Sequence, residues 1–532
     1  MSLIVKATFL CSLLLSNLSY GQSNARALGL EDYRRTERYL KECQTLKELV
    51  LKDKFQTDCH TNYHHFNSGV AKAYNPSARG EWVKVAAFNL WYPGSNSSPY
   101  KDLGIVAKII NKYDIVAASE LIGSVGKDLE HNERVKSFLQ MAPIQIRDLE
   151  RRLNSGYRSD IEERLKDLKS DYETAKNLYR APGYLLILDE LRKLDPTWSL
   201  LLAPSGEAAD GGNTEEFLGF YYRGLSVKPK INEHCEKFKK RKHGPSFACY
   251  PKLTKAWLGK SIREVFARRP YLGSFESGDF DFTLFTSHVV FRGATDADNM
   301  ARVLTPSFGV LDYRELGVGA TKSNFARLAE MKIILEIMEK IRSQSLEKDI
   351  IFLGDTNLES DNEFWPEILE GLPGAELFIK EPTTLSVPLY LSDGTETMGT
   401  ANDYDHIIMD LKESNECVKE NGTLSARVDN FLKGHFAELI HQKYLYRLPG
   451  VAQPNPALQS RRETLVEQMR SQLSSRLTIK RNKVVPDDSE IEETIMEFVA
   501  RVFLSQIFEE TYYKVYKEIV SDHLPVYFSC RR

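Results

Sequence analysis

One stretch of the sequence places an acidic residue beside a histidine, directly before a short apolar run. This stretch is Ser521-Asp522-His523-Leu524-Pro525-Val526. Such a pair can present a metal ligand and a proton-transfer group together. Because an Asp-His pair is common by chance, its meaning depends on whether similar residues occupy similar positions elsewhere.

Five further stretches place polar side chains of catalytic type where an apolar run begins or ends. They are Phe88-Asn89-Leu90, Ser119-Glu120, Thr286-Ser287-His288, Gly354-Asp355-Thr356-Asn357 and Asn402-Asp403-Tyr404-Asp405-His406. Functional side chains concentrate where loops leave a rigid scaffold. The pattern therefore predicts that residues far apart in the sequence meet at the tips of buried strands.

The residue types in these stretches favour a hard metal ion and hydrolysis. Glu120 and Asp522 are hard oxygen donors, and Asn89 and Asn357 add amide oxygens, which favours Mg²⁺, with Mn²⁺ or Ca²⁺ as the other candidates. Zinc would require more His or Cys ligands. Two histidines with further acids indicate hydrolysis, in which one imidazole deprotonates water and the other serves the leaving oxygen. A carboxylate bonded to each imidazole would fix its tautomer and orientation.

Hydrophobic patterning predicts the elements that must position these residues. Alternation over 81–92 predicts a strand with Asn89 at its end, and the apolar run at 114–121 predicts a buried strand that ends in Glu120. By the same reasoning, further strands are expected at 198–203, 217–222, 280–287 and 349–353, and helices at 102–111 and 324–341.

Composition is that of a globular protein with a substantial core. The chain has 532 residues, of which 42% are hydrophobic and 27% charged. This length allows two or three domains, or one large domain with insertions. The net charge of −3 provides no global basic field, so a polyanion would have to be met by a local patch or a metal. The basic stretch 237–243 is one such patch, with a solvated loop as the alternative.

The first residues have the pattern of an export signal. Lys6 precedes an apolar run at 7–15, and Ser19-Tyr20-Gly21 forms a small-residue cleavage site. The apolar run is too short to span a bilayer, and no other stretch of the sequence reaches that length. We therefore expect a signal peptide at 1–21 and export to the periplasm or the extracellular space.

Six cysteines remain after removal of the signal peptide. An even number in an exported chain predicts disulfides, although six cysteines allow many connectivities. Proximity in the sequence favours Cys43–Cys59 and Cys235–Cys249, which leaves Cys417–Cys530. The alternative is six buried free thiols.

Three charged segments of helical pattern lie outside the series of strands. Residues 22–80 predict a mainly helical N-terminal extension, and 125–180 an antiparallel helical pair with solvated charges. Residues 411–518 predict another long helical segment that leaves the core, and the chain comes back to the core directly at Asp522-His523. A separate domain is the alternative, but site residues on both sides of 411–518 favour an insertion.

Taken in this order, the six stretches resemble the motifs of the endonuclease/exonuclease/phosphatase superfamily, and most closely those of secreted deoxyribonucleases of the pancreatic type. The resemblance covers 81–124, 183–225, 262–293, 323–410 and 519–530. It implies an α/β fold, a four-layer sandwich of two mixed β-sheets flanked by helices. Residues 81–532 would form this one domain, with the large helical insertions at about 125–180 and 411–518.

The resemblance implies where the metal and the phosphate lie. Asn89 and Glu120 match the metal and phosphate end of the site, with Asp522 opposite, so that all three would hold the metal. Asp355 and Asn357 match residues that orient the attacked phosphate or the water.

The resemblance also implies an acid–base pair. His288 and His523 match the two proton-transfer residues, with Glu216 supporting His288 and Asp405 supporting His523. Arg268 matches an arginine that contacts the phosphate.

Two residues depart from the pattern. Thr214 stands where these nucleases carry a DNA-contacting tyrosine, and His406 replaces a residue that is commonly arginine. Together with the unmatched helical segments, these departures argue against binding in the groove of duplex DNA.

The activity implied by the resemblance is that of a secreted, divalent-metal-dependent phosphodiesterase that hydrolyses nucleic acid, DNA in preference to RNA. A sphingomyelinase or a phosphoinositide phosphatase of the same superfamily is the alternative, as is a non-catalytic module that retains the fold. The sequence indicates no partner for the helical insertions.

Overall fold

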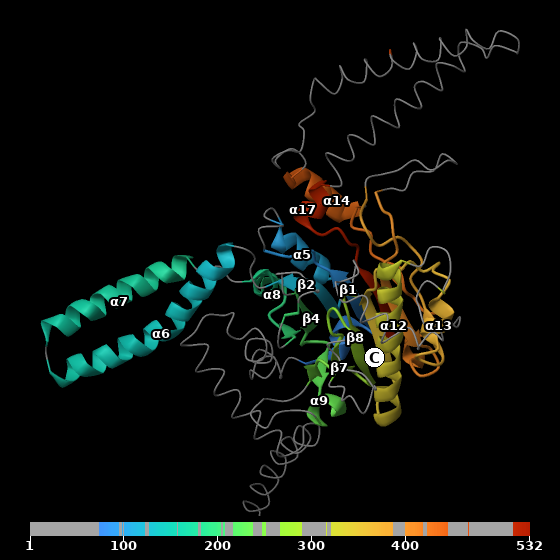
Figure 1. Ribbon diagram of the computed structural model, residues 1–532, viewed down its shortest axis with the longest axis horizontal. Helices are drawn as coiled ribbons and strands as arrows, with labels where there is room; N and C mark the ends of the chain where they lie inside the picture. The colour runs from blue at the N-terminus through green and yellow to red at the C-terminus, as the bar shows by residue number, and fades with distance from the viewer. Residues whose placement is uncertain are drawn as a thin grey trace, which may run out of the picture.

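Two mixed β-sheets pack face to face at the centre of the protein, and helices lie against both outer faces (Figure 1). The computed structural model describes residues 74–94, 98, 101–122, 127–156, 158–178, 182–203, 206–207, 216–237, 247–251, 266–289, 315, 321–386, 399–418, 423–432, 434–444, 467 and 514–532.

The first sheet brings three predicted site segments to one edge. Its strands are β1 (Trp82–Asn89), β2 (Ile115–Ile122), β3 (Trp198–Leu202), β4 (Glu216–Arg223), β12 (Arg427–Val428) and β13 (Val526–Arg531), in the order β12-β13-β1-β2-β4-β3. β1 and β2 are parallel, whereas β13 is antiparallel to β1 and β4 to β2. The ends of β1 and β2 therefore meet the residues that precede β13 and the start of β4.

The second sheet brings the remaining segments to the corresponding edge. Its strands are β5 (Lys228–Lys230), β6 (Ala248–Cys249), β7 (Tyr271–Ser277), β8 (Phe280–Thr286), β9 (Ile350–Asp355), β10 (Ala375–Leu377) and β11 (Asp405–Asp410). The order is β10-β11-β9-β8-β7-β5, with β6 paired to β7. β8 and β9 are parallel, and Asp405 at the start of β11 lies opposite Asp355 at the end of β9.

Alternation along β1 shows how the sequence builds the layers. Val83, Val85 and Ala87 belong to the core between the two sheets, whereas Ala86 and Phe88 belong to the core beneath the helices of the first sheet. A strand buried on both faces in this way has to be apolar at nearly every position. Its first polar buried residue, Asn89, marks the point where the strand reaches the site.

The helices complete four layers. α5 (Leu103–Ile110), α8 (Gly183–Leu194), α14 (Gly434–Tyr444) and α17 (Lys514–Ile519) pack on the first sheet, and α12 (Lys322–Gln344) and α13 (Trp365–Leu369) pack on the second. Asp102 caps α5, because its Oδ1 accepts from the backbone N of Ile105 at 3.0 Å. The predicted α/β sandwich of two mixed sheets flanked by helices is confirmed.

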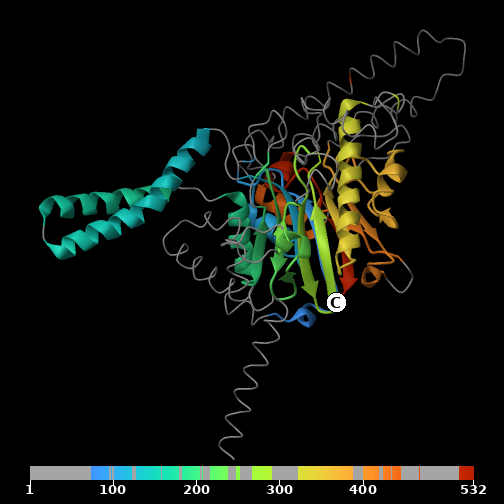
Figure 2. The same ribbon diagram turned by 60° about the horizontal axis from the view of Figure 1, so that its bottom comes forward.

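A helical hairpin stands away from the sandwich. α6 (Lys127–Ser155) and α7 (Ser159–Leu178) pack against each other through Leu149, Ile161 and Leu165, within the segment expected to form a helical pair. In both views the hairpin projects from the body of the protein (Figure 2). None of the helices in the described ranges combines the length and apolarity that a membrane span needs.

The described part of 411–518 is not a purely helical segment outside the core. After the short 3-10 helix η6 (Asn415–Cys417), β12 pairs with β13, and α14 and α17 bury Ile440 and Ile519 against the first sheet. A strand of two residues is too short for alternation to reveal it. These parts of the segment therefore belong to the layers of the sandwich.

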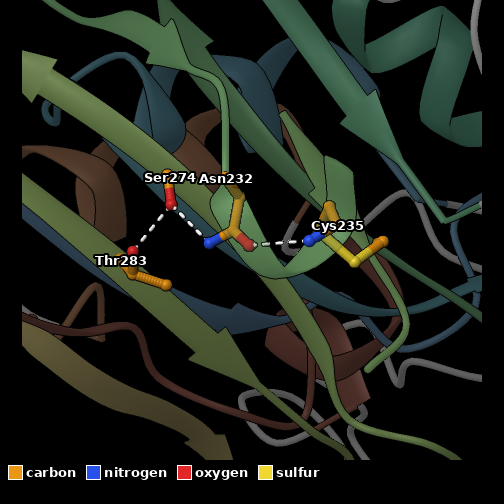
Figure 3. Close-up of a disulfide and its surroundings, with 5 residues drawn as sticks. Asn232, Cys235, Ser274 and Thr283 are labelled. Atoms are coloured by element: carbon orange, nitrogen blue, oxygen red, sulfur yellow. Dashed lines mark hydrogen bonds between the residues drawn. A yellow bond between two sulfur atoms is a disulfide. The ribbon is translucent and has the colours of Figure 1, made fainter. Parts of the chain in front are cut away.

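Two of the three predicted disulfides lie in the described ranges, and both are present. Cys235 in α9 (Glu233–Lys237) is bonded to Cys249 in β6, and Cys417 in η6 to Cys530 in β13. Figure 3 shows Asn232 accepting from the backbone N of Cys235 at 3.0 Å and donating to Ser274 at 2.8 Å, which ties the disulfide to β7.

Several predictions concern residues beyond the described ranges. They are the signal peptide 1–21, the extension 22–80 before Tyr74, the Cys43–Cys59 pair, Thr214 and the basic stretch 237–243 after Lys237. The described end of the extension contains the 3-10 helix η2 (Pro76–Arg79).

Candidate active site

His288 forms a dyad with Glu216. His288 follows β8, and its Nδ1 donates to Oε2 of Glu216 at the start of β4, over a distance of 2.7 Å. Both side chains are buried. Burial and Arg268 lower the pKa of His288, but Glu216 and Asp355 outweigh them, so the pKa lies above its ordinary value. The carboxylate thus fixes the tautomer and leaves Nε2 as the reactive nitrogen.

His523 forms a second dyad, with Asp405. Nδ1 of His523 donates to Oδ2 of Asp405 at 2.7 Å, and the hydroxyl of Thr383 donates to the same oxygen at 2.7 Å. Burial opposes the charged form of His523, but Asp405 and Asp355 raise its pKa well above the ordinary value. Thr383 was not predicted from the sequence, because nothing local links it to Asp405.

Asp355 lies between the two dyads. Its Oδ2 is 3.7 Å from Nε2 of His288 and 3.6 Å from Nε2 of His523. The same oxygen accepts from Nδ2 of Asn89 at 3.1 Å, and Nδ2 of Asn89 also donates to Oε1 of Glu120 at 2.9 Å. Side chains from both sheets therefore meet around one carboxylate.

Two of the predicted residues have strained backbones. Glu120 and Asn357 have φ angles of 55° and 52°, a region that glutamate rarely adopts and that asparagine tolerates better. At Glu120 the register of β2 with β4 shifts, which turns the side chain into the site. Asn357 is held by its backbone N, which donates to Asp355 Oδ1 at 3.0 Å, and by its Nδ2, which donates to Val289 O at 2.8 Å.

Arg268 lies behind the His288 dyad. Its Nε donates to the carbonyl oxygen of His288 at 3.1 Å and is 3.3 Å from Oε2 of Glu216. The residue is buried, so its charge is met by Glu216 rather than by water.

Glu120 and Asp522 present the oxygens best suited to hold a cation. Oε2 of Glu120 and Oδ1 of Asp522 are buried, and neither has a hydrogen-bond partner in the described part of the chain. Burial raises the pKa of Glu120 to about 7; His288 opposes this, and Glu216 and Asp522 add to it. Two buried carboxylate oxygens without hydrogen-bond partners, on groups that repel one another, fit a divalent cation with oxygen ligands such as Mg²⁺.

A second group of potential ligands is partly occupied by hydrogen bonds. Asp355, Asp405 and His523 offer ligand atoms that lie within 4.8 Å of one another. However, Asp405 and His523 bond each other, and Asp405 also accepts from Thr383. Only Oδ1 of Asp405 in this group is buried without a hydrogen-bond partner among the described residues, whereas Glu120 and Asp522 offer two such oxygens.

Two lysines that the sequence did not single out lie at the Asp522 side. Nζ of Lys101 donates to the carbonyl oxygens of Leu90 and Val520 at 2.6 Å each, next to Asn89 and Ser521. Nζ of Lys517 is 3.2 Å from Oδ2 of Asp522. Burial lowers the pKa of Lys101 to about 7, although Asp522 and Glu120 favour its charged form.

His406 lies outside the reaction space. Its Nε2 is 2.7 Å from the carbonyl oxygen of Leu358 and its Nδ1 is 3.2 Å from that of Ile379. The side chain is fully buried and contacts the ring of Trp365 edge to face. The residue therefore braces the start of β11 behind Asp405.

Comparisons with known proteins give fold-level likenesses. No family model and no curated protein matches the sequence. Among solved structures, an endonuclease/exonuclease/phosphatase family protein from Leptotrichia buccalis C-1013-b is 14% identical over 65% of this chain and 92% of that protein, with a TM-score of 0.32. A protein of the same family from Bacteroides thetaiotaomicron is 13% identical over 62% of this chain and 82% of that chain, with a TM-score of 0.28.

A third structure has a bound nucleic acid. TDP2 from D. rerio, complexed with a single-strand DNA product, is 12% identical over 66% of this chain and 88% of that chain, with a TM-score of 0.27. Scores at this level carry no conclusion about activity, so the chemistry has to be argued from the side chains.

Proposed function

We propose that the protein is a divalent-metal-dependent phosphodiesterase of the endonuclease/exonuclease/phosphatase superfamily. The observation that carries this proposal is the pair of carboxylate–histidine dyads, Glu216–His288 and Asp405–His523, whose free nitrogens face the same oxygen of Asp355. A structural role would not need two buried imidazoles with one nitrogen each left for a reactant.

The proton steps follow from this geometry. One imidazole takes a proton from a water molecule as the water oxygen bonds to phosphorus. The other imidazole gives a proton to the ester oxygen as its bond to phosphorus breaks. Glu216 and Asp405 stabilise the imidazolium that each His forms or carries. The products are a phosphomonoester and a free hydroxyl group.

Asp355, Asn357, Asn89 and Arg268 are assigned to positioning. Asp355 lies within reach of both Nε2 atoms and would accept from the attacking water, while its own orientation is fixed by Asn89 and by the backbone of Asn357. Arg268 supports the His288 side through the carbonyl oxygen of His288, and we assign to its positive charge a role in attracting the phosphate.

Glu120 and Asp522, with Asn89 beside them, would hold the metal. When bound, Mg²⁺ (or Mn²⁺ or Ca²⁺) neutralises negative charge on the phosphate oxygens. The unpaired oxygens of Glu120 and Asp522 support this assignment. Two carboxylates leave ligand positions for water and substrate, as is usual for Mg²⁺.

For the substrate we propose nucleic acid, DNA in preference to RNA, cleaved by a secreted endonuclease of the pancreatic deoxyribonuclease type. The order of the six sequence motifs and the residues within them support this substrate. The two disulfides support export, because such bonds persist in oxidising compartments. A sphingomyelinase or a phosphoinositide phosphatase would use the same dyads on a lipid phosphate.

A comparison of substrates tests the proposal. The full mature chain is assayed for nicking of supercoiled plasmid with Mg²⁺ and with EDTA, and in parallel for hydrolysis of sphingomyelin and of phosphoinositides in vesicles. We expect nicking that requires the metal. Lipid hydrolysis without nicking would contradict the substrate, and inactivity toward all three with Mg²⁺, Mn²⁺ or Ca²⁺ would contradict the catalytic assignment.

A further inference from the structure

Within the described part of the chain, positive φ angles at residues other than glycine occur only in and next to the candidate active site. Among the described residues, only Trp91, Tyr92, Glu120 and Asn357 combine a side chain with a positive φ angle. Glu120 and Asn357 already have proposed roles there. Such strain costs on the order of 1–3 kcal/mol per residue and persists where the surroundings enforce it, often for function. The remaining two residues, Trp91 and Tyr92, therefore require an explanation.

Trp91 and Tyr92 lie in the loop that follows β1, two and three residues after Asn89. Their φ angles are 42° and 51°, and neither is a glycine or an asparagine that would tolerate this region. The backbone N of Trp91 donates to Oδ1 of Asn89 at 3.0 Å, and the hydroxyl of Ser98 donates to the carbonyl oxygen of Tyr92. The loop is thus fixed at both residues.

Close packing against α8 holds the same loop from the other side. A Cβ at Gly183, the first residue of α8, would lie 2.0 Å from the carbonyl oxygen of Pro93. Gly94, with a φ angle of 74°, also approaches Gly183 closely, because a Cβ there would lie 2.8 Å from the Cα of Gly183. Two glycines therefore permit the loop to press against the helix and keep its strained path.

The path of this loop places the hydroxyl of Tyr92 where it can form a hydrogen bond with Glu216 inside the site. The hydroxyl of Tyr92 donates to Oε1 of Glu216 at 3.1 Å, while the other oxygen, Oε2, accepts from Nδ1 of His288 at 2.7 Å. Both carboxylate oxygens of Glu216 are therefore bonded, and the group cannot rotate without breaking one bond. Burial next to Glu120 and Glu216 raises the pKa of Tyr92, so the phenol stays protonated and remains a donor.

We propose that Tyr92 is a positioning residue that acts through Glu216 to orient the imidazole of His288. The strained loop after β1 aims the phenol at Oε1, Glu216 is held with Oε2 toward His288, and Nε2 of His288 is held toward Asp355. This inference rests on the proposed function for its kinetic part, but the orientation of His288 can be measured without turnover.

The first test is spectroscopic and uses the metal-free full chain. In Tyr92→Phe only the hydroxyl is removed. With ¹⁵N-labelled histidine, the Nδ1 proton of His288, assigned by its loss in His288→Gln, should move upfield and broaden in Tyr92→Phe. The control is Tyr221→Phe. Tyr221 lies on β4, as Glu216 does, but its buried hydroxyl donates to Tyr184 O at 2.8 Å and not to either dyad. An unchanged His288 signal in Tyr92→Phe would overturn the proposal, even if the protein proved inactive.

The second test is a double-mutant cycle with Mg²⁺ and bis(p-nitrophenyl) phosphate. Tyr92→Phe should lower kcat about tenfold, the range typical of an outer-shell partner, with KM changed less than about twofold. In the Glu216→Gln background the same substitution should have no further effect, because its route to His288 is already lost. An equal loss in both backgrounds would show that Tyr92 acts independently of Glu216 and would overturn the proposal.

Discussion

His288 and His523 direct their free Nε2 atoms at one oxygen, Oδ2 of Asp355, from distances of 3.7 and 3.6 Å. The two histidines are supplied by different sheets, since His288 follows β8 and His523 precedes β13. Each has its Nδ1 committed to a separate buried carboxylate. The packing of two sheets thus creates a space that two imidazoles face, which a single sheet could not provide.

Loss of either imidazole should remove one proton-transfer step. We expect His288→Ala and His523→Ala each to lower kcat for Mg²⁺-dependent plasmid nicking by about 10²–10⁴-fold, the usual contribution of a general acid or base. The double variant should be little worse than the weaker single variant, because the two steps serve one reaction. His435→Ala, an exposed histidine on α14, is the matched control. Nicking that survives His523→Ala would contradict the mechanism.

Metal binding should depend on Glu120, Asp522 and pH. Burial, above all, raises the pKa of Glu120 to about 7, so this carboxyl group is mostly protonated below pH 7. A cation that binds there at lower pH must first displace that proton. Calorimetric titration with Mn²⁺ should therefore show affinity that rises as pH increases from 6 to 8. Asp522→Asn should weaken binding at least about tenfold, as loss of a ligand carboxylate demands, whereas Asp167→Asn on the exposed face of α7 should not. Equal affinities in the two variants would place the metal elsewhere.

The sequence predicted those parts of the fold that local pattern controls. The apolar run of β9 ends in Asp355, and the wholly buried run of β2 carries Glu120, so the strand tips could be read directly. The helix expected at 102–111 corresponds to α5, because the spacing of apolar residues along a helix is a local signal. Proximity in the sequence likewise identified the Cys235–Cys249 disulfide.

What the sequence could not show depends on contacts between distant segments. Thr383 reaches Asp405, and Tyr92 reaches Glu216 across 124 positions, through loops whose sequences carry no periodic signal. The left-handed backbone of Trp91 and Tyr92 is unmarked by glycine, because tertiary packing imposes it. The two-residue strand β12 is recognisable only from its pairing with β13.

Removal of the Lys101 ammonium should destabilise the protein. Lys101→Met leaves the carbonyl oxygens of Leu90 and Val520 without their donor, and both residues are fully buried. An unsatisfied buried acceptor costs about 1–3 kcal/mol, so the urea midpoint should fall measurably. Lys108→Met, at an exposed lysine on the following helix α5, should change stability by less than about 0.5 kcal/mol. Equal midpoints for the two variants would contradict this role.

A carboxyl pair at the opposite end of the second sheet should make stability fall as pH rises. Burial, with the neighbouring Asp281, raises the pKa of Glu347 to about 8 from 4.5. An acid with a raised pKa stabilises the fold below its unfolded value, and this stability is lost as pH rises through the folded value. Relative to wild type, Glu347→Gln should therefore gain melting temperature between pH 4.5 and 8. Glu376→Gln, exposed on β10, is the control; a gain that is the same at pH 4 and pH 9 would contradict the shift.

The two disulfides should differ in their contribution to stability. Cys417–Cys530 spans 113 residues, whereas Cys235–Cys249 spans 14. A cross-link stabilises mainly by restricting the unfolded chain, and the loop-entropy relation gives about 5 kcal/mol for the longer loop against about 3 kcal/mol for the shorter. We therefore expect Cys417→Ala with Cys530→Ala to lower the denaturant midpoint more than Cys235→Ala with Cys249→Ala.

Reductant should also lower the denaturant midpoint of the wild type, and an unchanged midpoint in reductant would contradict a structural role for both bonds. The reverse order between the two double variants would mean that contacts near Asn232 and Ser274, rather than chain entropy, decide the effect.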